Sequence, residues 1–234
     1  MKDLAMFGIN DSFAGQVVNF LPSKIRGKIN CLISSTPLSE IKKNISFHSK
    51  SHDKIEYPKE NKIFGFPVFH DKDFTKILKK RKIKKVLICE DRGEDRLKIF
   101  KKIKKLKKKI EILKFIHKNS FFSGKNNIGE GSIIFPNNYF GYKTDVGKIT
   151  VIQSGCNIEH HNTIGDYCDI NPKVTTGGFT KIHDGCEINI SVDIINRIII
   201  EKNSRVGAGS LVLKNIRKSE LHYGRPAKLM NKIE

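Results

Sequence analysis

A short stretch of the chain could do acid–base or metal chemistry. Glu159, His160 and His161 place a carboxylate and two imidazoles on consecutive residues, and His183 follows in the same half of the chain. Histidine titrates near neutral pH, so it suits a general base that takes a proton from an attacking amine or hydroxyl. Histidine is also a common zinc ligand. Which of the two chemistries applies depends on how the surrounding structural elements position these side chains.

Those elements repeat with a period of six residues, which neither an α-helix nor an ordinary strand produces. A parallel β-helix does, because each short strand and its turn use one repeat while aliphatic residues stack along the axis. Thirteen of the fifteen residues at this spacing are Ile or Val. The column is Ile128, Ile134, Phe140, Val146, Ile152, Ile158, Ile164, Ile170, Thr176, Ile182, Ile188, Ile194, Ile200, Val206 and Val212.

A second column, four residues further on, carries small or modest side chains that suit a narrow core. It includes Cys156, Cys168 and Cys186, and the last two are eighteen residues apart, one turn of a three-sided coil. We therefore predict that these cysteines are buried core residues with no catalytic role. His160 falls at a turn, two residues after the core position Ile158, so its imidazole should project from the prism.

The first half of the chain has a different pattern. Short apolar runs at residues 4–7, 29–33 and 86–89 alternate with helical patterns at 74–78 and 97–106. Strands that alternate with helices are typical of a parallel α/β domain. The sequence thus predicts a small Rossmann-like α/β domain over residues 1–116, followed by a β-helix domain over residues 117–234.

Composition narrows the class of protein. The formal net charge is +20, but in the lysine-rich run from 98 to 109 apolar residues recur at helical spacing, so these lysines are expected to form the wet face of an amphipathic helix. The five cysteines form no Cys-x-x-Cys pair, which favours free thiols in a reducing cytoplasm. No apolar run approaches the ~20 residues that cross a bilayer, and the first residues lack the build of a signal peptide.

Five motifs resemble those of one family. They are Gly65-Phe66-Pro67-Val68, then Ile116-His117-Lys118-Asn119-Ser120, Asn157-Ile158-Glu159-His160 with Ile164-Gly165-Asp166-Tyr167, Val206-Gly207-Ala208-Gly209-Ser210, and Tyr223-Gly224-Arg225-Pro226-Ala227-Lys228. Together they look like the hexapeptide-repeat sugar acetyltransferases: the sialic-acid O-acetyltransferases and the UDP-4-amino-sugar N-acetyltransferases of bacillosamine-type pathways. The likeness runs nearly end to end.

The resemblance implies a fold, a reaction and an assembly. The β-helix would be left-handed, three copies would form a homotrimer, and acetyl-CoA would lie between neighbouring coils as co-substrate, with no metal. The acetyl group would pass to an amino or hydroxyl group of a nucleotide-linked sugar. An alternative is O-acetylation of a free sialic-acid-like sugar.

The resemblance also suggests roles for individual residues. His160 would be the general base, flanked by Glu159 and His161. Acetyl-CoA would contact Asp169, Gly178, Ile190 and Ala208, with the backbone N–H of Gly178 close enough to the thioester oxygen to stabilise an oxyanion. After the first strand, Asn10, Asp11 and Ser12 are the candidates for binding the nucleotide sugar, because a helix begins there.

Two departures from the family pattern bear on the base and on the nucleotide-sugar loop. The family usually has a carboxylate directly after the base, where it orients the ring, and this chain has His161 there. A neutral His161 can accept or donate one hydrogen bond, whereas a protonated one would disfavour a second positive charge on His160. The loop after the first strand also lacks the family's glycine spacing, since it reads Gly8-Ile9-Asn10-Asp11-Ser12-Phe13-Ala14-Gly15.

Two rival functions stay open. His160, His161 and His183 could serve a metal-dependent β-helix enzyme resembling the γ-class carbonic anhydrases, but adjacent histidines on a strand or turn are expected to point apart. A non-catalytic basic scaffold or nucleic-acid binder would need an aromatic platform or a base-reading motif, and the sequence offers neither.

Overall fold

The computed structural model describes residues 2–37, 40, 61–107 and 109–233. The chain divides into two compact units. Met1–Asp91 and Lys98–Leu113 make the first unit, and Arg92–Leu97 and Lys114–Glu234 make the second. Among the described residues, no helix combines the length and apolar character that crossing a membrane requires.

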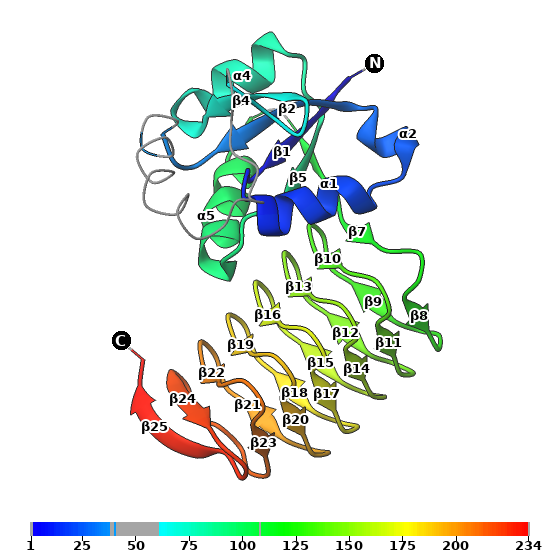
Figure 1. Cartoon of the computed structure of the whole chain (residues 1–234), viewed down its shortest axis with the longest axis vertical. Coiled ribbons are helices and arrows are strands. Elements are labelled where there is room, and N and C mark those ends of the chain that lie inside the picture. Colours follow the sequence, from blue (N-terminus) through cyan, green and yellow to red (C-terminus); the bar gives the residue numbers. More distant parts are fainter. Residues whose placement is uncertain (1, 38–39, 41–60, 108, 234) are drawn as a thin grey trace, which may run out of the picture. The chain divides into compact units, whose positions relative to one another are not determined.

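The first unit is built on a six-stranded sheet with the order β3-β4-β2-β1-β5-β6 (Figure 1). All neighbours are parallel except β3 and β4. The strands are β1 (Leu4–Phe7), β2 (Ile29–Ser34), β3 (Lys62–Ile63), β4 (Phe66–His70), β5 (Lys85–Ile88) and β6 (Glu111–Ile112). All four residues of β1 are buried, as expected for a strand covered on both faces. The predicted parallel α/β domain is confirmed.

Short helices connect these strands. They are η1 (Asp11–Gly15), α1 (Gln16–Phe20), α2 (Ser23–Arg26), η2 (Asp71–Asp73), α4 (Phe74–Lys80) and α5 (Gly93–Lys104). In α5 the predicted apolar positions Ile99 and Ile103 are buried, and the lysines between them are exposed. The helix ends at Lys104, so Leu106 and Ile110 lie beyond it, although their spacing had continued the helical pattern.

The second unit is a left-handed parallel β-helix, as the resemblance implied. Its two-residue strands pair with those eighteen residues away, for example Ile133 with Val151, so each coil is eighteen residues long and three-sided. The first face contains β7 (Phe115–Ile116), β10 (Ile133–Ile134), β13 (Val151–Ile152), β16 (Asp169–Ile170), β19 (Glu187–Ile188), β22 (Arg205–Val206), β24 (Glu220–Tyr223) and β25 (Lys228–Lys232). In this face β25 pairs antiparallel with β24.

The other two faces are wholly parallel (Figure 1). The second contains β8 (Phe121–Phe122), β11 (Tyr139–Phe140), β14 (Asn157–Ile158), β17 (Thr175–Thr176), β20 (Asp193–Ile194) and β23 (Leu211–Val212). The third contains β9 (Asn127–Ile128), β12 (Asp145–Val146), β15 (Thr163–Ile164), β18 (Lys181–Ile182) and β21 (Ile199–Ile200).

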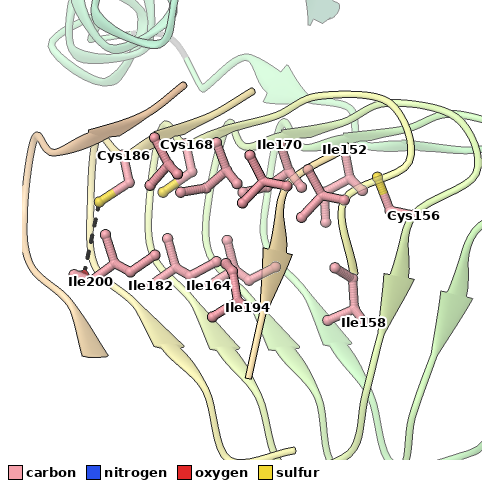
Figure 2. Packing of buried hydrophobic residues seen from close by; sticks show 14 of the residues in the cluster. Ile152, Cys156, Ile158, Ile164, Cys168, Ile170, Ile182, Cys186, Ile194 and Ile200 are labelled. Atoms are coloured by element: carbon pink, nitrogen blue, oxygen red, sulfur yellow. Dashed lines mark hydrogen bonds between the residues drawn. The ribbon is translucent and has the colours of Figure 1, made fainter. Parts of the chain in front are cut away.

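The core of the prism consists of the two predicted columns. Every member of the Ile/Val column is buried except Ile128, which is partly buried. All fourteen residues of the small column, from Ser132 to Ser210, are buried as well. Figure 2 shows Cys156, Cys168 and Cys186 pointing into the interior beside the isoleucines. The predicted burial of the three thiols is confirmed.

The turns between faces share a left-handed backbone conformation that their amino-acid composition did not predict. One residue in every six, from Lys125 to Gly209, has a φ between 46° and 76°. Four of these fifteen residues are glycines, which leaves eleven with side chains. A side chain in this left-handed region costs roughly 1–2 kcal/mol, and the stacked core must offset that cost. His161, with φ 57°, is one of the eleven.

Candidate active site at one corner of the prism

His160 and His161 lie at the corner between β14 and β15, and their rings face each other. Their Nδ1 atoms are 3.1 Å apart and their ring planes cross at 86°. The expectation that adjacent histidines point apart is therefore wrong here. The left-handed conformation of His161 turns the backbone sharply, so successive side chains leave the corner on the same side.

The coils before and after the pair supply its surroundings. Tyr142, one coil earlier, contacts the His161 ring edge-on at a centroid distance of 5.9 Å. Phe179, one coil later, stacks on the same ring at 4.7 Å with an interplanar angle of 13°. Phe179 also meets His160 edge-on at 5.3 Å. Both aromatic side chains are more than a third exposed, so the corner is an aromatic surface open to a ligand.

Gly178 lies directly beneath the His160 ring. A Cβ atom at Gly178 would stand 2.5 Å from Cε1 and 2.8 Å from Nε2 of His160, so only glycine leaves room for the imidazole in this position. Among the described residues, no backbone carbonyl accepts a hydrogen bond from the Gly178 N–H. The structure thus brings a candidate base and a candidate oxyanion donor together on adjacent coils.

Glu159, the third residue of the predicted group, is half-buried on the other side of His160. Its backbone is held by Thr144 and Thr176, which bond its carbonyl and its N–H at 2.8 and 3.2 Å. In the part of the chain that the structure describes, no hydrogen bond or ion pair joins the Glu159 carboxylate to either histidine. The group that contacts Nδ1 of His160 is His161.

Asp169, predicted to contact the cofactor, is engaged within the second unit. Its carboxylate accepts hydrogen bonds from the guanidinium of Arg96 and from the backbone N–H of Gly93, the latter at 3.0 Å. Arg96 is fully buried and also donates to the carbonyls of Ile149 and Cys168 at 2.8 and 3.0 Å. A buried guanidinium needs a counter-charge, so Asp169 has a structural role whatever else it contacts. No sequence pattern pointed to Arg96.

Ile190 and Ala208 lie one above the other on adjacent coils, at the corner between the first and second faces. The Gly209 N–H bonds the Ile190 carbonyl at 2.8 Å, and the Ile190 side chain is 52% exposed. Gly178 and His160 are at a different corner, between the second and third faces. The strands of the second face therefore separate Ile190 and Ala208 from Gly178, the third of these predicted cofactor contacts, and from the candidate base His160.

The predicted nucleotide loop lies at the point in the first unit where the strand order reverses, since β1 is flanked by β2 and β5. Ligands of open α/β sheets bind at such points, beyond the carboxyl ends of the strands. Asn10 begins the turn of η1: its side-chain oxygen accepts a hydrogen bond from the Ser12 N–H at 2.8 Å, and its amide donates to Asp91. Asp11, in the first turn of η1, is also engaged within the chain.

Two acidic residues beside this loop had not been predicted. Asp91 receives the Asn10 amide, and Glu90 accepts a hydrogen bond from the Ser35 hydroxyl at 3.1 Å. Both follow the third apolar run directly, which is the signal that could have found them. Gly8 lets the start of this loop lie against the backbone at Cys89, because a Cβ at Gly8 would stand 2.2 Å from the Cys89 carbonyl oxygen.

The described residues contain no group of three or more His, Cys, Asp or Glu side chains placed to hold a metal ion. Burial raises the pKa of the Cys156 and Cys186 thiols to about 12, and it raises the pKa of Cys168 well above its usual value. None of the three is an activated thiolate of the kind that acts as a nucleophile.

Comparison with known proteins gives the fold an independent test. No family model matches the chain. The structure is similar to that of PerB from Caulobacter crescentus in complex with CoA and GDP-perosamine, with a TM-score of 0.79 and 18% identity over 97% of both chains. It is similar to the acetyltransferase domain of PglB from Neisseria gonorrhoeae, with a TM-score of 0.74 and 17% identity over 98% of this chain and 100% of that one.

A third similar structure is WeeI from Acinetobacter baumannii, with a TM-score of 0.53 and 19% identity over 97% of this chain and 99% of that one. The chain has the fold of the hexapeptide-repeat sugar acyltransferases. The family resemblance that the motifs predicted is confirmed at the level of the fold, and it extends over both units.

Proposed function

We propose that the protein is an acetyl-CoA-dependent acetyltransferase whose acceptor is the amino group of a nucleotide-linked sugar. The observation that carries this proposal is the corner where the His160 imidazole lies against Gly178. A base and a backbone N–H on adjacent coils are the two groups that acyl transfer from a thioester needs. The similarity to PerB, crystallised with CoA and GDP-perosamine, supports the same reaction class.

In this mechanism His160 acts through its Nε2 atom, because Nδ1 faces His161. His160 takes a proton from the acceptor's amino group, and the neutral amine attacks the thioester carbonyl carbon. The Gly178 N–H stabilises the negative charge that develops on the carbonyl oxygen. The C–S bond then breaks and the CoA sulfur takes up a proton. GDP-perosamine N-acetyltransferase from Caulobacter crescentus has been crystallised with one histidine replaced by asparagine or by alanine, which supports a histidine of importance in this fold.

The remaining assignments complete the proposal. Acetyl-CoA would extend over the second face from the Gly178 corner toward Ile190 and Ala208, because these predicted contacts lie at the two edges of that face. The nucleotide would bind at the carboxyl ends of β1, β2 and β5, where Asn10, Asp11 and Ser12 lie. Three copies would form a homotrimer, and the five free thiols support a reducing cytoplasm as the place of action.

The direct test is incubation of the purified protein with acetyl-CoA and a panel of nucleotide-linked sugars. The panel should contain 4-amino sugars, their hydroxyl analogues and a free sialic acid, with thiol release and product mass as readouts. Acetylation of an amino sugar at a rate far above that of its hydroxyl analogue supports the proposal. Turnover of the sialic acid alone would replace it with O-acetylation.

A further inference from the structure

The two imidazoles at the corner share a single hydrogen bond between nitrogens of the same kind. Because their Nδ1 atoms are 3.1 Å apart, one must carry the hydrogen and the other must accept it. When His160 is the donor, its Nε2 has a free lone pair and can act as a base. When His161 is the donor, the His160 Nε2 carries a hydrogen and can act as an acid.

We propose that His161 is a proton-relay residue: it passes protons between His160 and water during acetyl transfer to an ammonium acceptor. This inference rests on the proposed function, since it assumes that His160 removes the acceptor's proton. It goes further by assigning His161 a step that a carboxylate at this position performs poorly, because a nearby negative charge stabilises the imidazolium form of His160 and so opposes loss of its proton.

The packing around His161 holds its Nδ1 toward His160. The left-handed φ of 57° fixes the direction of its Cβ, and Phe179 lies flat on the ring at 4.7 Å. Arg197, at the same position one coil further on, places its guanidinium 5.3 Å from the Phe179 ring, so the stack continues into the next coil. Tyr142 closes the ring's edge. Phe179 and Tyr142 thus restrict a half-buried side chain, which favours one ring orientation.

The chemistry of an amine acceptor calls for such a relay. At neutral pH an alkylamine is an ammonium, so the balanced reaction of ammonium and acetyl-CoA gives an amide, CoA thiol and one free proton. In the first step the ammonium proton moves to Nε2 of His160, the Nδ1 hydrogen of His160 moves to His161, and the Nε2 hydrogen of His161 leaves to water. The neutral amine then attacks, forming the N–C bond.

The second half of the reaction returns the pair to its starting state. As the C–S bond breaks, the Nε2 hydrogen of His160 passes to the CoA sulfur. His161 gives its Nδ1 hydrogen back to His160 and takes a proton from water at Nε2, while the amide nitrogen loses its remaining extra proton to water. Two protons have then left and one has entered, which matches the single proton released overall. A hydroxyl acceptor releases none and would not need the relay.

The test compares His161→Asn with His183→Asn, the same replacement elsewhere in the β-helix. The asparagine amide oxygen can still accept the His160 Nδ1 hydrogen, but it cannot relay a proton. We expect His161→Asn to lower kcat on an amino sugar by about 10- to 100-fold. We expect KM values within about threefold, since the variant keeps the binding contacts. Added imidazole buffer should restore kcat in proportion to its concentration, and His183→Asn should behave as wild type.

Histidine-selective ¹⁵N NMR gives a readout that does not depend on turnover. We expect His160 and His161 to be opposite tautomers in the resting protein, one bearing hydrogen on Nδ1 and the other on Nε2. The relay is overturned if both rings are the same Nε2–H tautomer. It is also overturned if His161→Asn keeps wild-type kcat, or if its lower kcat ignores the buffer, which would indicate orientation alone. Loss of the proposed function is distinguishable, because the wild-type protein would then acetylate no amine.

Discussion

The β-helix and the α/β unit differ in how directly the sequence position of a residue predicts its structural environment. In the β-helix, residue number alone tells whether a side chain lies in the core, at a turn or on a face, because the eighteen-residue register continues through all the parallel strand pairs from β7 to β23. In the α/β unit the buried strands are just as clear, but the loops that follow them have no repeat. Which residues in these loops contact one another becomes apparent only once the order of the strands is known.

The difference teaches where chemistry can be found in each region. In a repeat, a functional residue is an exception within its own column. The corner column contains Gly124, Tyr142, His160, Gly178 and Asn196. The approach of His160 to Gly178 has no counterpart at Gly124, where an added Cβ would meet no atom within 4 Å. In the α/β unit the site is found from topology, since Asn10 and Asp91 are far apart in sequence but follow neighbouring strands.

The largest expected effect tests the corner itself. His160→Ala should lower turnover by ~100- to 10,000-fold, because the acceptor's proton then has no base in reach. Affinity for CoA should change little, since the ring acts on the acceptor. Steady-state kinetics and calorimetric titration with CoA separate the two quantities. If His160→Ala retains most of the wild-type turnover, His160 is not the base.

The second expected effect concerns Asp169 and asks whether it is a structural or a cofactor residue. Asp169→Ala leaves the fully buried Arg96 without its counter-charge, which typically costs about 3–5 kcal/mol. We expect a matching loss in the free energy of unfolding by denaturant. In the folded fraction, CoA affinity should stay near that of wild type. A large loss of CoA affinity at unchanged stability would instead support the cofactor assignment.

His160 and Asp169 also show how much of the fold and of the site the sequence could predict. The six-residue period predicted both core columns, the coil length and the outward direction of His160, because a repeat imposes the same packing on every coil. It could not predict the Arg96–Asp169 ion pair, since Arg96 lies outside the repeat and pairs with it across more than seventy residues. Nor did it predict the contact between the two histidines, because that depends on the left-handed φ of one residue.

The third prediction uses Gly178 to test the fit beneath the base. In Gly178→Ala the new Cβ would stand within 2.5 Å of the His160 ring, whose exposed imidazole can move aside. We expect a small loss of stability, but a displaced base should cost about 10- to 100-fold in turnover. The matched control is the double variant His160→Ala/Gly178→Ala. Thermal unfolding should show that the alanine destabilises less when the imidazole is absent, and equal costs in both backgrounds would contradict the contact.

The fourth prediction moves to the α/β unit. Asn10→Ala removes the cap on the Ser12 N–H and the contact with Asp91, and a lost cap costs roughly 1 kcal/mol. If this loop holds the nucleotide, KM for the nucleotide sugar should rise several-fold while kcat at saturation is retained. The matched control is Asn30→Ala, in β2, whose side-chain amide likewise both donates and accepts: it donates to the Lys2 carbonyl and accepts from the Arg81 guanidinium. Equal KM values for the two variants would place the nucleotide elsewhere.

The smallest effect is expected at the cysteines, where the repeat predicts a role in packing alone. Serine already occupies the same column at Ser132, where its hydroxyl donates to a backbone carbonyl at 2.7 Å, as the Cys156 thiol does at 3.2 Å. The double variant Cys156→Ser/Cys186→Ser should therefore keep turnover within about tenfold at neutral pH.

The stability of the same double variant should respond to pH differently from that of wild type. Burial raises the pKa of both thiols to about 12, whereas an unfolded cysteine titrates near pH ~8.5. Their contribution is therefore complete below that pH and is lost as the pH rises toward 12, because only the unfolded chain ionises freely. Each thiol adds up to about 1.4 kcal/mol per pH unit to this loss. Denaturant unfolding between pH 8 and pH ~10.5 should give a shallower decline for the double variant than for wild type. An acetylated cysteine found by mass spectrometry, or identical declines, would show that the repeat had misplaced these side chains.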